Sequence, residues 1–221
     1  MLRSTFFICV LALSGLAQAQ TAPSASEIAS YTGLHLAAHQ GDTTDVTRLL
    51  AQGADPNVRD GSLRTPAHVA AFASHDDVIA ALAAGGADMN ALESGIYDVL
   101  TIAAVADDPE LVSLAMELGN SPELITSIYD GTALIAAAHL GHYDVVARLV
   151  DGGAPLDHVN NLGWTALMEA VVLGDGGPDH IRTVQILVKA GANKSITDRN
   201  GVTPLEHATE RGYDEIISLL E

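Results

Sequence analysis

The hydrophobic positions of this chain follow a short helical pattern that stops and restarts along its length. In residues 131–157 an apolar run at 133–138 follows Thr132, and Gly141 comes soon after the run. A threonine hydroxyl can accept from free backbone N–H groups at a helix start, and glycine adopts the left-handed conformation that ends a helix. A second stripe follows at helical spacing, and its members are Val145, Val146, Leu149 and Val150. The pattern predicts two short helices joined by a tight reversal.

Helices this short are marginal alone in water, so neighbouring copies must supply the missing core. The copies are present, because the residue that precedes the first helix recurs at intervals of 33, 33, 34, 33 and 38 residues. The last interval is longer, and its extra residues fall in the glycine-rich stretch 174–179, which we expect to lengthen and project the turn between two helices. The residues at the recurring position are Thr32, Thr65, Asp98, Thr132, Thr165 and Thr203.

This unit resembles the ankyrin repeat. Residues 65–70, TPAHVA, differ from the ankyrin signature T-P-L-H-x-A only at Ala67, and residues 32–37, TGLHLA, lack only the proline. The resemblance covers residues 31–221 in six degenerate copies. It implies an all-α fold, an ankyrin-repeat solenoid of about six helix-turn-helix repeats with β-turn tips, in which each repeat contacts only its neighbours.

The first 19 residues are typical of a secretory signal peptide. Arg3 supplies the positive charge, residues 6–13 form an apolar segment too short to span a bilayer, and Ala17-Gln18-Ala19 is a cleavage signal. A buried N-terminal helix is the alternative interpretation. We expect cleavage after Ala19, a mature start at Gln20, a linker over residues 20–30 and an ankyrin-repeat domain over residues 31–221.

Cleavage would remove Cys9, the one cysteine of the chain. A mature protein without thiols suits an oxidising compartment. No later segment has the apolar length of a membrane span, so the chain is expected to have no membrane anchor after cleavage. Together with the short basic start of the signal and the alanine-rich composition, this predicts an exported bacterial protein of the periplasm.

The chain is strongly acidic. It carries 28 Asp and Glu against 10 Lys and Arg, a formal net charge of −18. Such a surface repels nucleic-acid phosphates and anionic membranes and steers basic partners. A charge that serves only solubility is an equally open interpretation.

Few residues carry a pattern for chemistry. The chain has no nucleophile elbow, no phosphate-binding G-x-x-x-x-G-K and no H-E-x-x-H, which predicts that it is not an enzyme and has no cofactor. His35 and His39 have a spacing that can hold a metal, but no third ligand is placed nearby. The resemblance instead implies that His35, like His68, bonds to backbone. The loop 175–179 lacks the alternating ligands of a calcium loop, so no metal site is predicted.

In ankyrin-repeat proteins, partners bind the β-turn tips and the exposed face of each first helix, which form a concave groove. Carried over by position, the predicted partner-binding residues are Phe72, Tyr97, Tyr129, His139, Leu140, Trp164, Val172 and Leu173, with Arg64 and Val202 at further turn positions. Aromatic anchors within a polar rim are the composition of an interface hot spot. For Trp164 and Tyr97, packing between neighbouring turns as core stays open.

The sequence therefore predicts a non-catalytic periplasmic scaffold that acts as a monomer and binds a protein partner. A basic partner would suit its acidic surface. The resemblance to exported bacterial ankyrin proteins implies an inhibitor, such as an immunity-type protector against cell-wall hydrolases, or a stabiliser of a periplasmic enzyme. The alternative is a periplasmic protein that binds a small ligand or a metal through the histidines of the first repeats.

Overall fold

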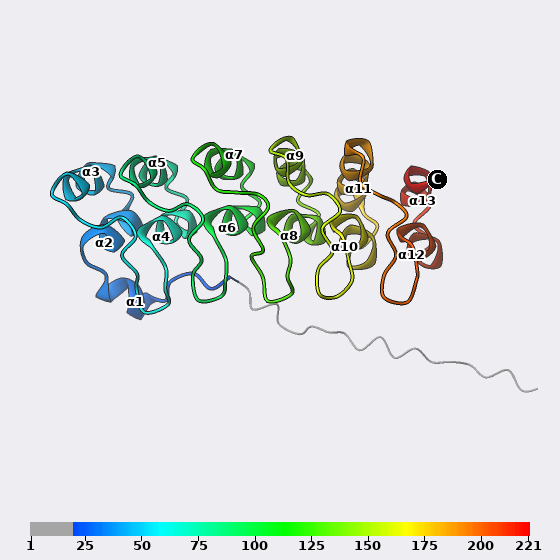
Figure 1. Cartoon of the computed structure of the whole chain (residues 1–221), viewed down its shortest axis with the longest axis horizontal. Coiled ribbons are helices and arrows are strands. Elements are labelled where there is room, and N and C mark those ends of the chain that lie inside the picture. The colour runs from blue at the N-terminus through cyan, green and yellow to red at the C-terminus, as the bar shows by residue number, and fades with distance from the viewer. Residues whose placement is uncertain (1–19) are drawn as a thin grey trace, which may run out of the picture.

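The computed structural model describes residues 20–221, and the predicted signal peptide lies outside this range. Within the range there are thirteen α-helices and no β-strand, and all helices except the first stack in two layers (Figure 1). None of these helices is long and apolar enough to cross a membrane. The predicted all-α solenoid is confirmed. The helices are α1 (Ala25–Ser30), α2 (Gly33–Gln40), α3 (Thr43–Ala51), α4 (Pro66–Phe72), α5 (Asp76–Ala84), α6 (Val99–Val105), α7 (Pro109–Glu117), α8 (Ala133–Leu140), α9 (Tyr143–Asp151), α10 (Ala166–Val172), α11 (Pro178–Ala190), α12 (Pro204–Arg211) and α13 (Asp214–Leu220).

In repeats three and four a side-chain cap starts the first helix. The Thr132 hydroxyl accepts the backbone N–H of Ile135 at 3.4 Å. Asp98, which replaces threonine in the third repeat, accepts the N–H of Thr101 at 2.8 Å. Gly141, with φ of 74°, ends α8 in the left-handed conformation. Short-range chemistry therefore fixes where these helices begin and end.

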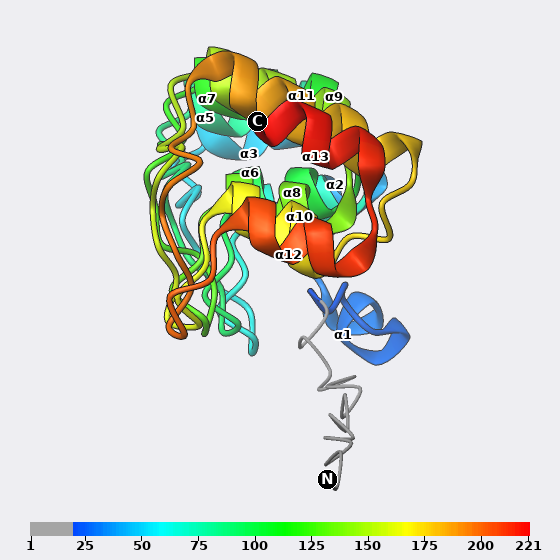
Figure 2. The same cartoon turned by 90° about the vertical axis from the view of Figure 1, so that its right-hand side faces the viewer.

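The core lies between the two layers of helices, which Figure 2 shows in a view along the solenoid. On α9, Val145, Val146 and Leu149 are completely buried, and Val150 is half-buried against them. Burial of a side chain of this size contributes about 1.5–3 kcal/mol. The predicted stripe of the second helix is thus the face that holds each repeat to its neighbours.

Long hairpin-shaped loops extend from the first-helix layer and form a row along one side of the solenoid (Figure 2). Within one loop, the Asn160 backbone N–H donates to the Trp164 carbonyl at 3.0 Å. Neighbouring loops are joined as well, since the Asn161 N–H donates to the Tyr129 carbonyl at 2.8 Å. The loops are therefore ordered by backbone bonds both within and between repeats.

The histidines of the ankyrin-like motif hold one repeat to the next. His35 Nε2 donates to the Arg64 carbonyl at 2.9 Å, and His68 Nε2 donates to the Tyr97 carbonyl at 3.2 Å. Burial lowers the pKa of His68. This favours the neutral ring, whose Nδ1 accepts the Thr65 backbone N–H at 3.1 Å. In the third repeat Thr101 replaces the histidine and donates to a hydroxyl of the next loop at 2.7 Å. The predicted structural role of the motif histidine is confirmed.

A second series of histidines lies at the N-terminal ends of second helices, with His75 and His142 at the N-caps of α5 and α9 and His180 in the first turn of α11. In each case a ring nitrogen donates to a carbonyl at the end of the first helix in the preceding repeat, with His75 bonded to His39 at 3.2 Å, His142 to Ala104 at 3.0 Å and His180 to His139 at 3.1 Å. The extra residues of repeat five precede His180. They lengthen the turn between α10 and α11, as predicted. The second helix of this repeat is longer as well, since α11 has 13 residues and α9 has 9.

The segment expected as a linker carries the helix α1. Glu27 on α1 accepts from Arg64 Nη1 and from the Ser62 hydroxyl, both at 2.8 Å, and Arg64 Nη2 donates to the Thr21 carbonyl at 2.8 Å. Arg64, which was expected on an open turn, is only 3% exposed. It is buried because α1 lies against the first-helix layer at the N-terminal end of the solenoid (Figures 1 and 2).

Candidate protein-binding face

We call the surface between the row of loops and the first helices the concave face. The predicted binding residues that are exposed on it belong to repeats four and five. Tyr129 is 37% exposed, Leu140 and Leu173 are each 43% exposed, and the His139 side chain is 46% exposed. Leu140 and Leu173 are large apolar side chains open to water at the ends of adjacent helices, and such exposed apolar surface is typical of an interaction site.

The packing of α8 against α10 explains why these residues lie together. Leu140 and Leu173 occupy equivalent positions of consecutive repeats, as do His139 and Val172. Equivalent positions on two packed, parallel helices face the same way. Val172 is half-buried, so the open apolar surface is contributed mainly by the two leucines.

The three predicted anchors Phe72, Tyr97 and Trp164 are half-buried. Phe72 and Tyr97 pack against the apolar core, and burial raises the pKa of the Tyr97 hydroxyl. For Tyr97, core packing is thus the interpretation that the structure favours. Trp164 is not among the described side chains that pack against this core, and its contact with a partner stays a prediction.

Sequence reasoning missed Glu169, whose side chain is 4% exposed on α10. Asn160 Nδ2 donates to Glu169 Oε1 at 2.8 Å, and Oε2 lies 3.3 Å from Nδ1 of His139. Oε2 is buried and accepts no hydrogen bond from the residues that the structure describes. A signal was available, because the equivalent residues of repeats two and three are Val69 and Ile102. A carboxylate at a position that is apolar in repeats one to four marks a departure from the repeat.

The loop tips carry a second feature that was not predicted. Leu63 and Ile96 have φ values of 59° and 61°, where repeats five and six have Gly163 and Gly201. The left-handed region costs a residue with a side chain about 1–2 kcal/mol. Leu63 is also 51% exposed. An apolar side chain is therefore held in a strained backbone and presented to solvent.

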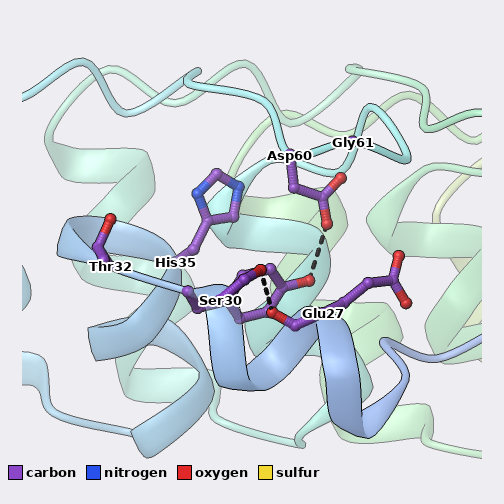
Figure 3. A pocket seen from close by; sticks show the side chains of 7 residues that line it. Glu27, Ser30, Thr32, His35, Asp60 and Gly61 are labelled. Carbon is purple, nitrogen blue, oxygen red and sulfur yellow. Dashed lines mark hydrogen bonds between the residues drawn. The ribbon is translucent and has the colours of Figure 1, made fainter.

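A pocket at the N-terminal end is lined by α1 and the first two repeats (Figure 3). The Tyr31 hydroxyl donates to Asp60 Oδ2 at 2.8 Å across it, and the Ser30 hydroxyl donates to the Glu27 carbonyl at 2.6 Å. His35 also lines the pocket, but its Nε2 is engaged by the Arg64 carbonyl. The polar side chains of Glu27, Tyr31, His35 and Asp60 in this pocket are thus already bound to one another or to Arg64.

The charges at this end shift two pKa values in opposite directions. Hydrogen bonds from the hydroxyl and backbone of Ser24, and then from Arg64 and Ser62, lower the pKa of Glu27 to about 2. Burial, followed by the bond to the Asp60 carboxylate, raises the pKa of the Tyr31 hydroxyl well above its usual range. Both groups are therefore held in the ionisation state that favours the network at neutral pH.

The residues that could bind a metal are dispersed. Among residues 20–221, no group of three or more His, Cys, Asp or Glu side chains has the arrangement to hold a metal ion. His35 and His39 thus gain no third ligand from the fold in the described part of the chain.

Stacked helix pairs, ordered loops on one side and an open concave face define a solenoid repeat protein of the kind that binds other proteins. The chain belongs to the ankyrin-repeat family, since the family model for ankyrin repeats (three copies) matches residues 9–93 and 100–198.

Bacterial relatives cover nearly the same length. The chain is 35% identical over 186 residues to the ankyrin repeat protein YahD of Escherichia coli (strain K12), which is 84% of this chain and 92% of that protein. The solved structure of an ankyrin repeat domain (ABAYE2397) from Acinetobacter baumannii AYE is 38% identical, with a TM-score of 0.80, over 85% of this chain and 95% of that one. EF0377, an ankyrin repeat protein, is 32% identical with a TM-score of 0.79, over 86% of this chain and 98% of that one.

Proposed function

We propose that this protein is an exported, non-catalytic ankyrin scaffold that binds one protein partner on the concave face of repeats four and five and thereby inhibits or stabilises it. The observation that carries the proposal is the exposure of Tyr129, Leu140 and Leu173 on repeats four and five, with the half-buried Trp164 in the loop of repeat five. Aromatic anchors supply most of the affinity at many protein interfaces, and exposed apolar side chains such as the two leucines mark such interfaces.

The charge supports a basic partner. The chain carries a formal net charge of −18, and an acidic surface raises the association rate of a positively charged protein. The same charge opposes nucleic-acid binding. Self-repulsion between such chains also favours a monomer.

The first 19 residues support export to the periplasm, because they combine Arg3, a short apolar segment and an Ala17-Gln18-Ala19 cleavage signal. Fractionation of cells that express the full chain, with mass spectrometry of the product, tests this part. A periplasmic product that begins at Gln20 is expected. The variant Ala19→Arg should stay unprocessed, and a cytoplasmic wild-type product of full length would contradict export.

Site-specific photo-crosslinking in the source organism tests the binding face. A photoreactive residue at Leu173 should capture one partner, and the same residue at Leu140 should capture the same one. The matched control is Gln185, which is exposed on α11 in the outer layer and should capture nothing in common. Capture of that partner from Gln185 alone would place binding on the outer layer and reject the proposal.

The identified partner then separates the two modes of action. Purified partner is assayed for activity and for thermal inactivation, with and without the mature scaffold. Loss of activity on complex formation indicates an inhibitor, and a longer lifetime at unchanged activity indicates a stabiliser. The metal or small-ligand alternative rested on His35 and His39, and the bond of His35 to the Arg64 carbonyl weighs against it.

A further inference from the structure

The Glu169 carboxylate is deeply buried, and one of its two oxygens accepts no hydrogen bond from the described residues. Its side chain is 4% exposed, yet only one oxygen is hydrogen-bonded within the described chain, and the other, Oε2, is buried without a bond. An ionised carboxylate removed from water is costly unless its oxygens are bonded or paired with a charge. Oε2 is therefore the atom at which a positive group would be stabilised most.

The bonded oxygen is held rigidly. Asn160 Nδ2 donates to Glu169 Oε1 at 2.8 Å, while Asn160 Oδ1 accepts the backbone N–H groups of Leu162 and Trp164, each at 3.0 Å. Because the loop fixes both ends of the Asn160 amide, the carboxylate is fixed as well. The site is thus built by the loop and by α10 together.

His139, which belongs to the preceding repeat, covers the Glu169 oxygen Oε2. Its Nδ1 lies 3.3 Å from Glu169 Oε2, and its side chain is 46% exposed on the concave face. The backbone of His139 is held, since its carbonyl accepts from His180 Nε2 at 3.1 Å. Exposed side chains change rotamer rapidly, so the ring can move aside without disturbing the helix.

In repeat six the residues equivalent to Asn160 and Glu169 bind each other. There Asp198 takes the place of Asn160 and His207 takes the place of Glu169, and their side chains meet at 3.1 Å. Acid and base satisfy each other within that repeat. In repeat five the loop supplies an amide in place of a charge, which leaves the carboxylate to be neutralised from outside the repeat.

We propose that Glu169 is the anchor for an arginine side chain of the protein partner, and that His139 occupies this place when the partner is absent. The inference rests on the proposed function and names the chemistry of its partner at that face. Arginine fits better than lysine because its guanidinium is more weakly hydrated, so less hydration is lost when it pairs with a buried carboxylate.

Calorimetric titration of the mature protein tests the anchor with two peptides, acetyl-Gly-Arg-Gly-amide and its uncharged citrulline counterpart. We expect the arginine peptide to bind wild type at least tenfold more tightly than the citrulline peptide, and Glu169→Gln to remove this difference. The control Glu117→Gln, an exposed acid at the end of α7, should retain it. Equal binding of the peptides to wild type, or a preference that survives in Glu169→Gln, overturns the proposal.

A second variant keeps the test valid if Glu169→Gln folds poorly. His139→Ala removes the side chain that covers the carboxylate, so the arginine peptide should bind it at least as tightly as wild type. Binding more than threefold weaker than in wild type would show that His139 forms the site instead of covering it, which rejects the proposal.

The crosslinked partner separates the two proposals. A partner captured at Leu173 should lose at least tenfold in affinity in Glu169→Gln. If its affinity is unchanged, the arginine anchor is wrong and the scaffold proposal stands. If no partner is captured, the scaffold proposal fails, and the peptide titration still decides the anchor.

Discussion

The guanidinium of Arg64 lies 2.8 Å from the carboxylate of Glu27, although 37 positions separate them in the chain. The same guanidinium lies 3.3 Å from Asp60, which in turn accepts from the Tyr31 hydroxyl. The helix α1 contributes no buried residue of its own. A polar network centred on one buried arginine, more than apolar packing, therefore fastens α1 to the end of the solenoid.

Replacing Arg64 by alanine should destabilise the protein by about 3 kcal/mol, because removal of one partner from a buried ion pair leaves the other charge unpaired. Asp60, whose side chain is 8% exposed, is the group left without its cation. Urea unfolding followed by circular dichroism measures the change. Arg48→Ala, which breaks an exposed pair with Asp45, is the control and should cost at most about 1 kcal/mol. Equal losses in the two variants would contradict a central role for Arg64.

The Glu27 network should also weaken in acid. The pKa of Glu27 is about 2 in the folded protein against an ordinary value of 4.5. A lowered pKa contributes stability that is present above about pH 4.5 and is lost as the pH falls toward 2. Wild type should therefore be more stable than Glu27→Gln at pH 7, and this difference should shrink between pH 4.5 and pH 2. Urea midpoints of both proteins across this range provide the measurement, and a constant difference would refute the assignment.

The sequence predicted what is local and periodic. The cap at Thr132, the ending glycine at Gly141 and the structural role of His68 follow from short-range rules that each repeat obeys. The burial of Arg64 could not be predicted, because its partner lies in a segment without the repeat pattern. Nor could the pairing around Glu169, since periodicity identifies a polar residue at an apolar position but does not supply the loop amide that holds it.

The strain at Leu63 predicts a gain in stability from glycine. Leu63→Gly should stabilise the protein by about 0.5–1 kcal/mol, because relief of a left-handed φ worth about 1–2 kcal/mol outweighs the entropy that glycine adds to the unfolded chain. Leu63 is 51% exposed, so little apolar burial is lost. Leu63→Ala retains the strained φ of 59° and should show no gain. Thermal unfolding of the three proteins compares them, and a gain in the alanine variant would point to a cause other than backbone strain.

Packing of the hydrophobic core can be tested at Leu149, which is completely buried on α9. Leu149→Ala should cost about 2–5 kcal/mol of stability through lost burial and the cavity left behind. Chemical unfolding measures this loss. The exposed Leu140→Ala is the matched control, and it should leave stability within about 0.5 kcal/mol of wild type. If both variants lost the same stability, the assignment of Leu149 to the core and Leu140 to the surface would be wrong.

Replacing Trp164 should weaken partner binding while leaving the stability of the fold unchanged. The Trp164→Ala variant is expected to weaken partner binding by about 2 kcal/mol or more, as for an aromatic anchor at the centre of an interface, while its urea midpoint stays close to that of wild type. Calorimetry with the crosslinked partner measures the affinity. Phe72→Ala is the control, because Phe72 packs against the core and should lose stability with little change in affinity. A Trp164→Ala protein that unfolds as readily as Leu149→Ala would assign the tryptophan to the core and remove the anchor from the concave face.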